Sequence, residues 1–184
     1  MYLRHPALRD FDELERRYGE SRSHLKHFAS SSFTKEVFDR KLTDAEKDSN
    51  EFFLICRVDD DAIIGTINLS QIFRRSFQNA YLGYQLFAGF TGKGFMTEAV
   101  ALVIRFAFVD LKLHRIEANV QPNNSASIRV LERNGFINEG FSKRYLKIGG
   151  KWRDHERWAI IKENWNNSRI NVHTEGKKRF HTNT

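Results

Sequence analysis

The stretch Phe90–Ala99, FTGKGFMTEA, decides the fold, because it leads a glycine-rich turn directly into a helix. Gly92 and Gly94, with Gly89 just before them, can adopt backbone conformations that turn several N–H groups toward one point. The N-terminus of the helix adds a partial positive charge there. The stretch therefore predicts a cradle for an anionic group such as a phosphate. Its spacing fits neither the P-loop nor the dinucleotide-binding pattern, and a plain glycine turn is the alternative.

Two polar side chains of the same stretch can assist in holding an anion. Lys93 adds a positive charge, and Thr97 can offer its hydroxyl from the first turn of the helix.

The segments on either side of the glycine stretch form a strand–helix–strand unit. Residues 79–87 and 114–120 alternate as strands, and residues 95–110 between them have the wide apolar stripe of a buried helix. Strands joined in this way are parallel, and ligands bind where the loops beyond their carboxyl ends diverge. We therefore expect residues 86–94 and 121–127 to lie side by side.

The remaining elements surround this unit. Their periodicity predicts an opening strand at 1–4, helices at 7–18 and 34–48 with Thr34 as a cap, strands at 51–58 and 62–69, a helix at 124–133, and a closing hairpin of 136–147 and 153–162 around Gly149-Gly150. Gly65 within a strand indicates a bulge or a close backbone approach. The expected fold class is α/β (α+β): one domain over residues 1–165, with a mixed, mostly antiparallel sheet, one parallel strand pair and flanking helices.

Composition limits the classes of protein that fit. The chain has 184 residues with 40% hydrophobic content, enough for one core, and no apolar run approaches the ~20 residues of a membrane span, so we expect a cytoplasmic protein. A single cysteine, Cys56, excludes an intramolecular disulfide, and no zinc-ligand spacing is present, so no metal is expected. The net charge of +7 suits an anionic partner, and residues 166–184 form a basic tail that we expect to be poorly ordered.

A second group of polar residues follows the strand at 114–120. In residues 121–136, QPNNSASIRVLERNGF, Asn124 stands where a helix N-cap is expected, and Ser127 lies in the first turn. Both side chains would face the cleft beside the glycine stretch. An ordinary cap and an ordinary polar first-turn residue are the structural alternatives.

Five motifs in order resemble the GNAT family of N-acetyltransferases, and specifically its ribosomal-protein-alanine branch. The resemblance runs from Leu3 to Trp165 and rests on IIGTINL, on YLGYQLF followed by GKGFMTEA, on HRIEANVQPNNSAS, on LERNGFINEG and on GGKWRDH. It implies that acetyl-coenzyme A is the co-substrate and lies in an opening where the parallel strands splay apart.

The resemblance also implies roles for individual residues. The pantetheine arm would pair with the backbone of Leu86 and Phe87 and with Asn124, and Ser127 would lie near the thioester sulfur. The pyrophosphate would rest on the backbone amides of Thr91, Gly92, Lys93, Gly94 and Phe95.

Two departures from the family pattern matter. Gly89 stands where relatives carry Gln or Arg, which removes side-chain help at the pyrophosphate. Leu131 stands where many relatives carry a tyrosine acid, so Ser127 is the better candidate to protonate the departing thiolate.

The general base is not evident from the sequence. Glu117, on the polar face of a strand, and Glu98, in the first turns of the glycine-loop helix, are the leading side-chain candidates; Asp154, His155 and water relays are others. Glu98 can equally complement the helix dipole, and Glu117 can equally pair with a neighbouring cation.

Three functions fit these features. The first is acetylation of a protein N-terminal α-amine, with a ribosomal protein as acceptor and transient ribosome contact. The second is acetylation of a small amine such as a polyamine, an aminoglycoside or an amino acid. The third is a non-catalytic ribosome- or RNA-binding module that uses the basic tail. The sequence favours the first and does not distinguish a monomer from a dimer.

Overall fold

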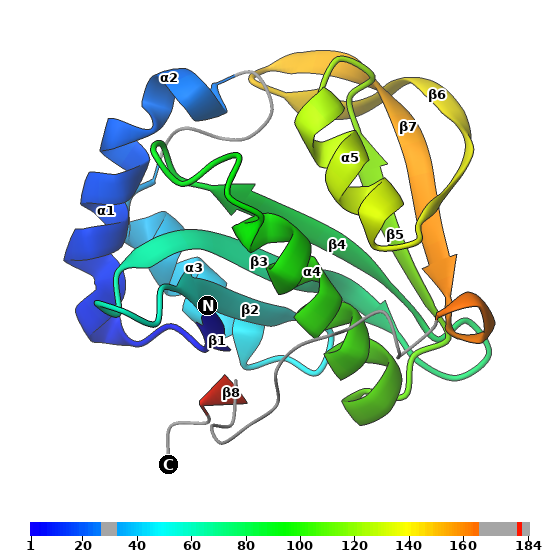
Figure 1. Ribbon diagram of the computed structural model, residues 1–184, viewed down its shortest axis with the longest axis horizontal. Coiled ribbons are helices and arrows are strands. Elements are labelled where there is room, and N and C mark those ends of the chain that lie inside the picture. Colours follow the sequence, from blue (N-terminus) through cyan, green and yellow to red (C-terminus); the bar gives the residue numbers. More distant parts are fainter. Residues whose placement is uncertain (27–32, 166–179, 182–184) are drawn as a thin grey trace.

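The computed structural model describes residues 1–26, 33–165 and 180–181 (Figure 1). In chain order its elements are β1 (Tyr2–Arg4), the 3₁₀ turn η1 (Leu8–Asp10), α1 (Phe11–Glu20), α2 (Arg22–Leu25), α3 (Lys35–Ala45), β2 (Glu51–Cys56), β3 (Ile63–Phe73), β4 (Asn79–Leu86), α4 (Phe95–Arg105), the π turn η2 (Phe106–Asp110), β5 (Arg115–Val120), α5 (Ser125–Arg133), β6 (Ile137–Ile148), β7 (Lys151–Ile161), the 3₁₀ turn η3 (Lys162–Asn164) and β8 (Phe180–His181).

One eight-stranded sheet organises the fold, in the order β6-β7-β5-β4-β3-β2-β1-β8. The pairing of β4 with β5 is parallel, as the crossover through α4 predicts, and every neighbouring pair from β4 to β1 and from β5 to β6 is antiparallel. The predicted mixed, mostly antiparallel sheet in an α/β domain is confirmed. The short strand β8 adds to the far edge by pairing in parallel with β1, which the sequence did not predict.

Helices cover both faces of the sheet and create two cores. Figure 1 shows α4 in front of the sheet and α3 behind it. Along β2, Phe53 and Ile55 join the core under α4, whereas Phe52 and Leu54 join the core that α1 and α3 cover. A strand buried on both faces reads as a continuous apolar run rather than an alternation, which explains the FFLIC sequence. Cys56 is fully buried in the second core, as expected.

The element boundaries differ from prediction in a few places. The predicted helix at 95–110 keeps its length, but its last turn is π-helical, with the Leu111 N–H donating to the Phe106 carbonyl at 3.0 Å. The predicted strand at 62–69 continues to Phe73. At Gly65 an added Cβ would lie 2.4 Å from the Gln85 carbonyl oxygen, so the predicted close backbone approach is confirmed.

The predicted poorly ordered tail falls on residues 166–184, of which only β8 belongs to the described residues. No helix in the described part of the chain has the length and apolarity that crossing a membrane requires.

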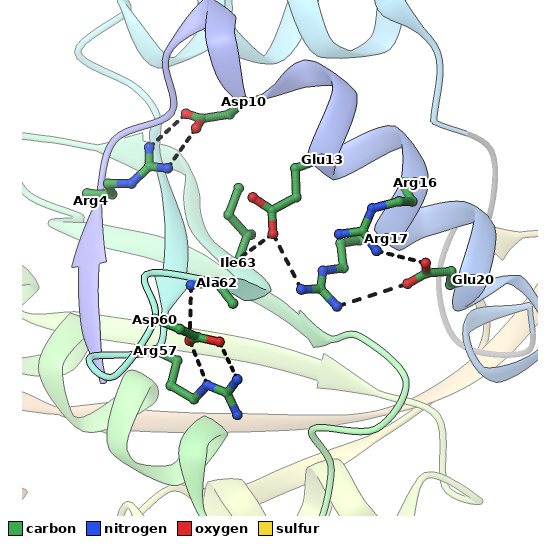
Figure 2. A network of polar contacts seen from close by, with 10 residues as sticks. All are labelled: Arg4, Asp10, Glu13, Arg16, Arg17, Glu20, Arg57, Asp60, Ala62 and Ile63. Carbon is green, nitrogen blue, oxygen red and sulfur yellow. Dashed lines mark hydrogen bonds and ion pairs between the residues drawn. The ribbon is translucent and has the colours of Figure 1, made fainter.

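An ion pair and a hydrogen bond fix α1 and the turn before it against the sheet (Figure 2). Asp10 is 6% exposed, accepts two hydrogen bonds of 2.7 Å from the Arg4 guanidinium, and also accepts the Ala7 N–H. Further along α1, the Glu13 carboxylate accepts the Ile63 N–H at the start of β3 at 3.2 Å. The helix is therefore held at two points, one on β1 and one on β3.

We predict that Asp10→Ala lowers the free energy of unfolding by about 3 kcal/mol, because it leaves the Arg4 guanidinium without its buried partner. Urea unfolding measures the change. Asp60→Ala, which removes an exposed carboxylate paired with Arg57, is the control and should have little effect. Equal effects of the two substitutions would contradict the prediction.

The same pair makes stability depend on pH. Burial by itself raises the pKa of the Asp10 carboxyl, but the Arg4 guanidinium and the Ala7 N–H together lower it below its usual value. A lowered folded-state pKa means that this stabilisation is present above about pH 4 and is lost as the pH falls through the folded-state value. As the pH is lowered from 6 into the acid range, the difference in the free energy of unfolding between wild type and Asp10→Ala should therefore shrink.

Candidate active site

The parallel pair β4–β5 separates after only three residue pairs. Asn79 lies opposite Arg115, Ala80 opposite Ile116, and Tyr81 opposite Glu117, while β4 continues to Leu86 and β5 to Val120. Each strand stays paired with its outer neighbour, β4 with β3 and β5 with β7. The sheet thus opens into a gap at the carboxyl ends of its two central strands, as Figure 1 shows.

The main chain of β4 presents alternate residues to this gap. The Phe87 N–H donates to the Ile64 carbonyl of β3 at 2.9 Å, and the Phe87 carbonyl accepts the Phe90 N–H at 3.3 Å. Because main-chain groups alternate in direction along a strand, those of Leu86 and Tyr84 point toward β5 instead. The sequence suggested Leu86 and Phe87 as the pair that meets a ligand; the geometry brings Leu86 and Tyr84 to the gap.

The glycine stretch lies at the end of the gap and has the backbone conformation that a cradle needs. Gly92 and Gly94 have φ of +76° and +81°, in the left-handed region that other residues avoid. Gly94 is also the N-cap of α4 and has no side chain to satisfy the first N–H groups of that helix. Those N–H groups and the positive end of the helix are suited to bind an anion.

A cavity of about 900 Å³ joins the gap to the glycine stretch. Seven of the residues that the sequence suggested line it: Leu86, Thr91, Gly92, Gly94, Thr97, Asn124 and Ser127. The expectation that residues 86–94 and 121–127 lie side by side therefore agrees with the structure. Phe87, Lys93 and Phe95 do not line the cavity; Phe87 is buried in the second core, Lys93 is exposed, and Phe95 packs on the first core.

The two glutamates suggested as bases also lie outside the cavity wall. Glu98 forms an ion pair with the α-amine of Met1 at 3.7 Å. The Glu117 carboxylate accepts a hydrogen bond from Arg115 at 2.8 Å. The structure thus engages both carboxylates elsewhere and does not bring them to Ser127.

Two hydrogen bonds hold the start of α5 against the gap. The Asn124 Oδ1 atom accepts the Ser127 N–H at 3.2 Å, so Asn124 is the helix cap that the sequence indicated. From the other side of the gap, the Tyr84 hydroxyl donates to the Ser127 carbonyl at 3.3 Å. Burial raises the pKa of Tyr84 to about 12, so the hydroxyl keeps its proton and remains a donor. Ser127 is thereby fixed in the cavity wall.

His155 is a buried histidine in this wall. It lies on β7, is 3% exposed and lines the cavity. Its Nδ1 atom lies 3.0 Å from the Arg153 carbonyl, which can only accept a hydrogen bond. The proton of the neutral ring therefore resides on Nδ1, and Nε2 is left as an acceptor. Asp154, the neighbouring candidate, instead accepts the Arg144 N–H at 2.7 Å outside the cavity.

The glycine stretch is also tied to the N-terminal helices. Two guanidinium groups contact the Phe90 ring: its centroid lies 5.2 Å from the Cζ atom of Arg17 in α1 and 5.8 Å from that of Arg57 after β2. The Ala88 N–H donates to the buried Ser21 hydroxyl at 2.9 Å. These contacts hold the loop that leads into the cradle against the layer of α1 and α2.

A sheet opened beside a glycine cradle, with a polar helix start across the gap, has the geometry that suits an extended phosphate-bearing ligand. Comparison with known proteins gives the family. Residues 1–137 match the acetyltransferase (GNAT) domain, and the chain belongs to this family of N-acetyltransferases.

Relatives agree with this assignment. The probable N-acetyltransferase YjcK of Bacillus subtilis is 41% identical over 169 residues, which span 88% of this chain and 93% of that protein. The [Ribosomal protein uS5]-alanine N-acetyltransferase of Escherichia coli is 41% identical over 114 residues, 62% of this chain and 59% of that protein. Among solved structures, Mycobacterium smegmatis RimJ in complex with CoA-disulfide has a TM-score of 0.80 at 29% identity, covering 88% of this chain and 81% of that one.

We predict that Gly94→Val lowers affinity for coenzyme A by at least about tenfold, because a side chain at positive φ distorts the cradle. Titration calorimetry with coenzyme A measures the affinity. Gly150→Val is the matched control, since Gly150 has φ of +79° but lies in the β6–β7 turn outside the cavity. Both substitutions should reduce stability, and normal affinity in Gly94→Val would refute the cradle.

Proposed function

We propose that this chain transfers the acetyl group of acetyl-coenzyme A to the N-terminal α-amine of a protein, with a ribosomal protein as the first acceptor to test. The observation that carries the proposal is the gap between β4 and β5, which ends at the glycine cradle. Main-chain groups of Tyr84 and Leu86 along the gap suit the amides of the pantetheine arm, and the N–H groups at its end suit the pyrophosphate. The relatives named above support the donor and the kind of acceptor.

The reaction needs a neutral amine as the nucleophile and a proton for the thiolate that leaves. The acceptor nitrogen attacks the thioester carbonyl carbon, the C–S bond breaks, and the amine loses a proton as the thiolate gains one. An α-amine with a pKa of about 7.7–8.0 is roughly one-tenth to one-sixth neutral at pH 7, whereas a lysine amine near 10.4 is almost wholly charged. An α-amine acceptor therefore demands much less of the enzyme.

Ser127 is the proposed donor of the proton that the thiolate takes up. Its hydroxyl belongs to the cavity wall, and its main chain is held on one side by Asn124 and on the other by Tyr84. Such positioning is what proton transfer to a leaving group requires.

His155 is the proposed acceptor of the amine proton, directly or through one water molecule. Its Nε2 atom is available because Nδ1 is occupied by the Arg153 carbonyl, and the ring lines the same cavity as Ser127. Glu98 and Glu117, which the sequence suggested for this role, are paired with Met1 and Arg115 outside the cavity. The coenzyme-binding set is Leu86, Thr91, Gly92, Gly94, Thr97 and Asn124, joined by Tyr84, with Lys93 as a nearby positive charge.

Release of free thiol from acetyl-coenzyme A tests the function directly. We expect turnover with short peptides that begin with alanine and carry a free α-amine, and none with the same peptides blocked at the N-terminus. Mass spectrometry should find one added acetyl group on the α-nitrogen. Acetylation of internal lysines alone would contradict the proposal.

Substitutions at the two proposed proton-transfer residues test the mechanism. Ser127→Ala and His155→Gln should each lower kcat by roughly 10²-fold, the low end for a lost acid or base. Coenzyme A affinity should be unchanged in both. The loss in His155→Gln should shrink as the pH rises toward 9, because more of the amine is already neutral. Ser125→Ala is the control, since Ser125 is exposed on the same helix outside the cavity; wild-type kcat in Ser127→Ala would refute its assignment.

A further inference from the structure

The described part of the cavity wall carries positive charge and contains no carboxylate. Among the described residues that line it, none is Asp or Glu, whereas Arg40 and Lys41 of α3 and Arg129 and Arg133 of α5 are included. Residues 27–32, which stand between α2 and α3 in the chain, contain no acidic residue either. The wall is therefore positively charged, and this charge limits which ligands it can bind.

The four cations form two pairs on opposite faces of the sheet. Arg129 and Arg133 lie one turn apart on α5, which Asn134 ties to α4 by donating to the Thr97 carbonyl at 3.3 Å. This pair is beside the glycine cradle and suits the phosphates of the donor. Figure 1 shows α3 behind the sheet, on the opposite face from α4. The pair on α3 is therefore left for a different anion.

No ion pair joins Lys41 or Arg40 to a carboxylate among the described residues, although the charge of Asp44 acts on both. The Lys41 amine lies 4.7 Å from the centroid of the Phe52 ring, and burial, followed by the charge of Arg40, lowers its pKa. The three acidic residues of α3 have other bonded partners: Glu36 bonds to Thr34, Asp39 pairs with Lys35, and Asp44 pairs with Lys47 at 2.6 Å. Lys41 is a half-buried cation without an ion pair, and an anionic ligand would offset the cost of its partial burial.

A positive wall also acts on the amine that reacts. Nearby positive charge disfavours an ammonium ion, so it lowers the pKa of an acceptor amine and increases the neutral fraction that can attack. The same charge repels a molecule with several ammonium groups, such as a polyamine or an aminoglycoside. The wall thus favours an acceptor with a single amine and a carboxylate close to it.

We propose that the acceptor is a polypeptide whose N-terminal α-amine is followed within a few residues by Asp or Glu, and that Arg40 and Lys41 bind that carboxylate. This specificity rests on the proposed N-terminal acetyltransferase function. Arg40 can bind a carboxylate with two parallel hydrogen bonds, and Lys41 adds a point charge from a less polar position.

The test uses the full chain, acetyl-coenzyme A and matched acceptors. Three alanine-initiated hexapeptides carry two Glu, two Gln or two Lys residues after the alanine and are otherwise identical; free glutamate and spermidine are also assayed by thiol release. We expect kcat/KM to fall from the acidic to the neutral peptide by about tenfold, the effect of one charged hydrogen bond. The basic peptide and spermidine should be poorer still, and the preference should weaken at high salt.

Variants connect the preference to the two residues. Arg40→Gln and Lys41→Gln should each lower kcat/KM for the acidic peptide by about tenfold while changing the neutral peptide little. Arg40 is exposed, so its substitution reports on specificity even if Lys41→Gln folds poorly. Lys35→Gln removes the same charge from the same helix outside the cavity and should leave the ranking of acceptors unchanged.

The outcomes separate the two proposals. Equal use of the three peptides, a preference for the basic peptide, spermidine or free glutamate, or an equal loss on all peptides in both variants would overturn the specificity while leaving acetyl transfer intact. Absence of thiol release with every acceptor would overturn the proposed function itself, and this inference with it.

Discussion

The structure depends on an interruption of hydrogen bonding at the centre of its sheet. Two central strands pair for three residues, down to Tyr81 and Glu117, and then part. Each of the two strands stays paired with its outer neighbour, so the main-chain groups without a strand partner face the gap from the ends of β4 and β5. Unpaired backbone groups inside a protein are costly unless they meet water or a ligand. The gap is therefore suited to bind a ligand, because its main-chain groups have no partner strand.

The glycine cradle, α5 and β7 are all arranged around this gap. The glycine cradle closes one end of it with N–H groups, and α5 begins on its far side, held there by the Tyr84 hydroxyl. His155 reaches it from β7, which follows β5 throughout. The cationic side chains that line the cavity are also arranged around the gap, with one pair on each face of the sheet. Under the proposed function, the two substrates would approach from opposite faces and meet where the sheet is open.

The sequence predicted the fold, and it also predicted that the glycine stretch lies beside Asn124 and Ser127, because both depend on short-range patterns. Glycines before an amphipathic helix, and an asparagine before Ser127, can be recognised locally. Which strand residues face the gap depends on the register of β4 against β3, and this register turns the main chain of Tyr84 toward the gap and that of Phe87 toward β3. The residue proposed as the base could not be found locally either. Arg115 and the chain's own N-terminus occupy Glu117 and Glu98, and His155 comes from a strand 28 residues beyond Ser127, where only burial distinguishes it from its exposed neighbours.

The contacts of Phe90 with Arg17 and Arg57 bear on how such an enzyme can change over evolution. Tyr18 of α1 lines the cavity, and Arg17 of the same helix contacts the loop that leads into the glycine cradle. Replacing α1 would therefore remove one of the two cations near this ring. Under the proposed function, a change in α1 that alters the choice of acceptor would also disturb binding of the donor. A new specificity would then have to arise away from α1 or together with a compensating change in the loop.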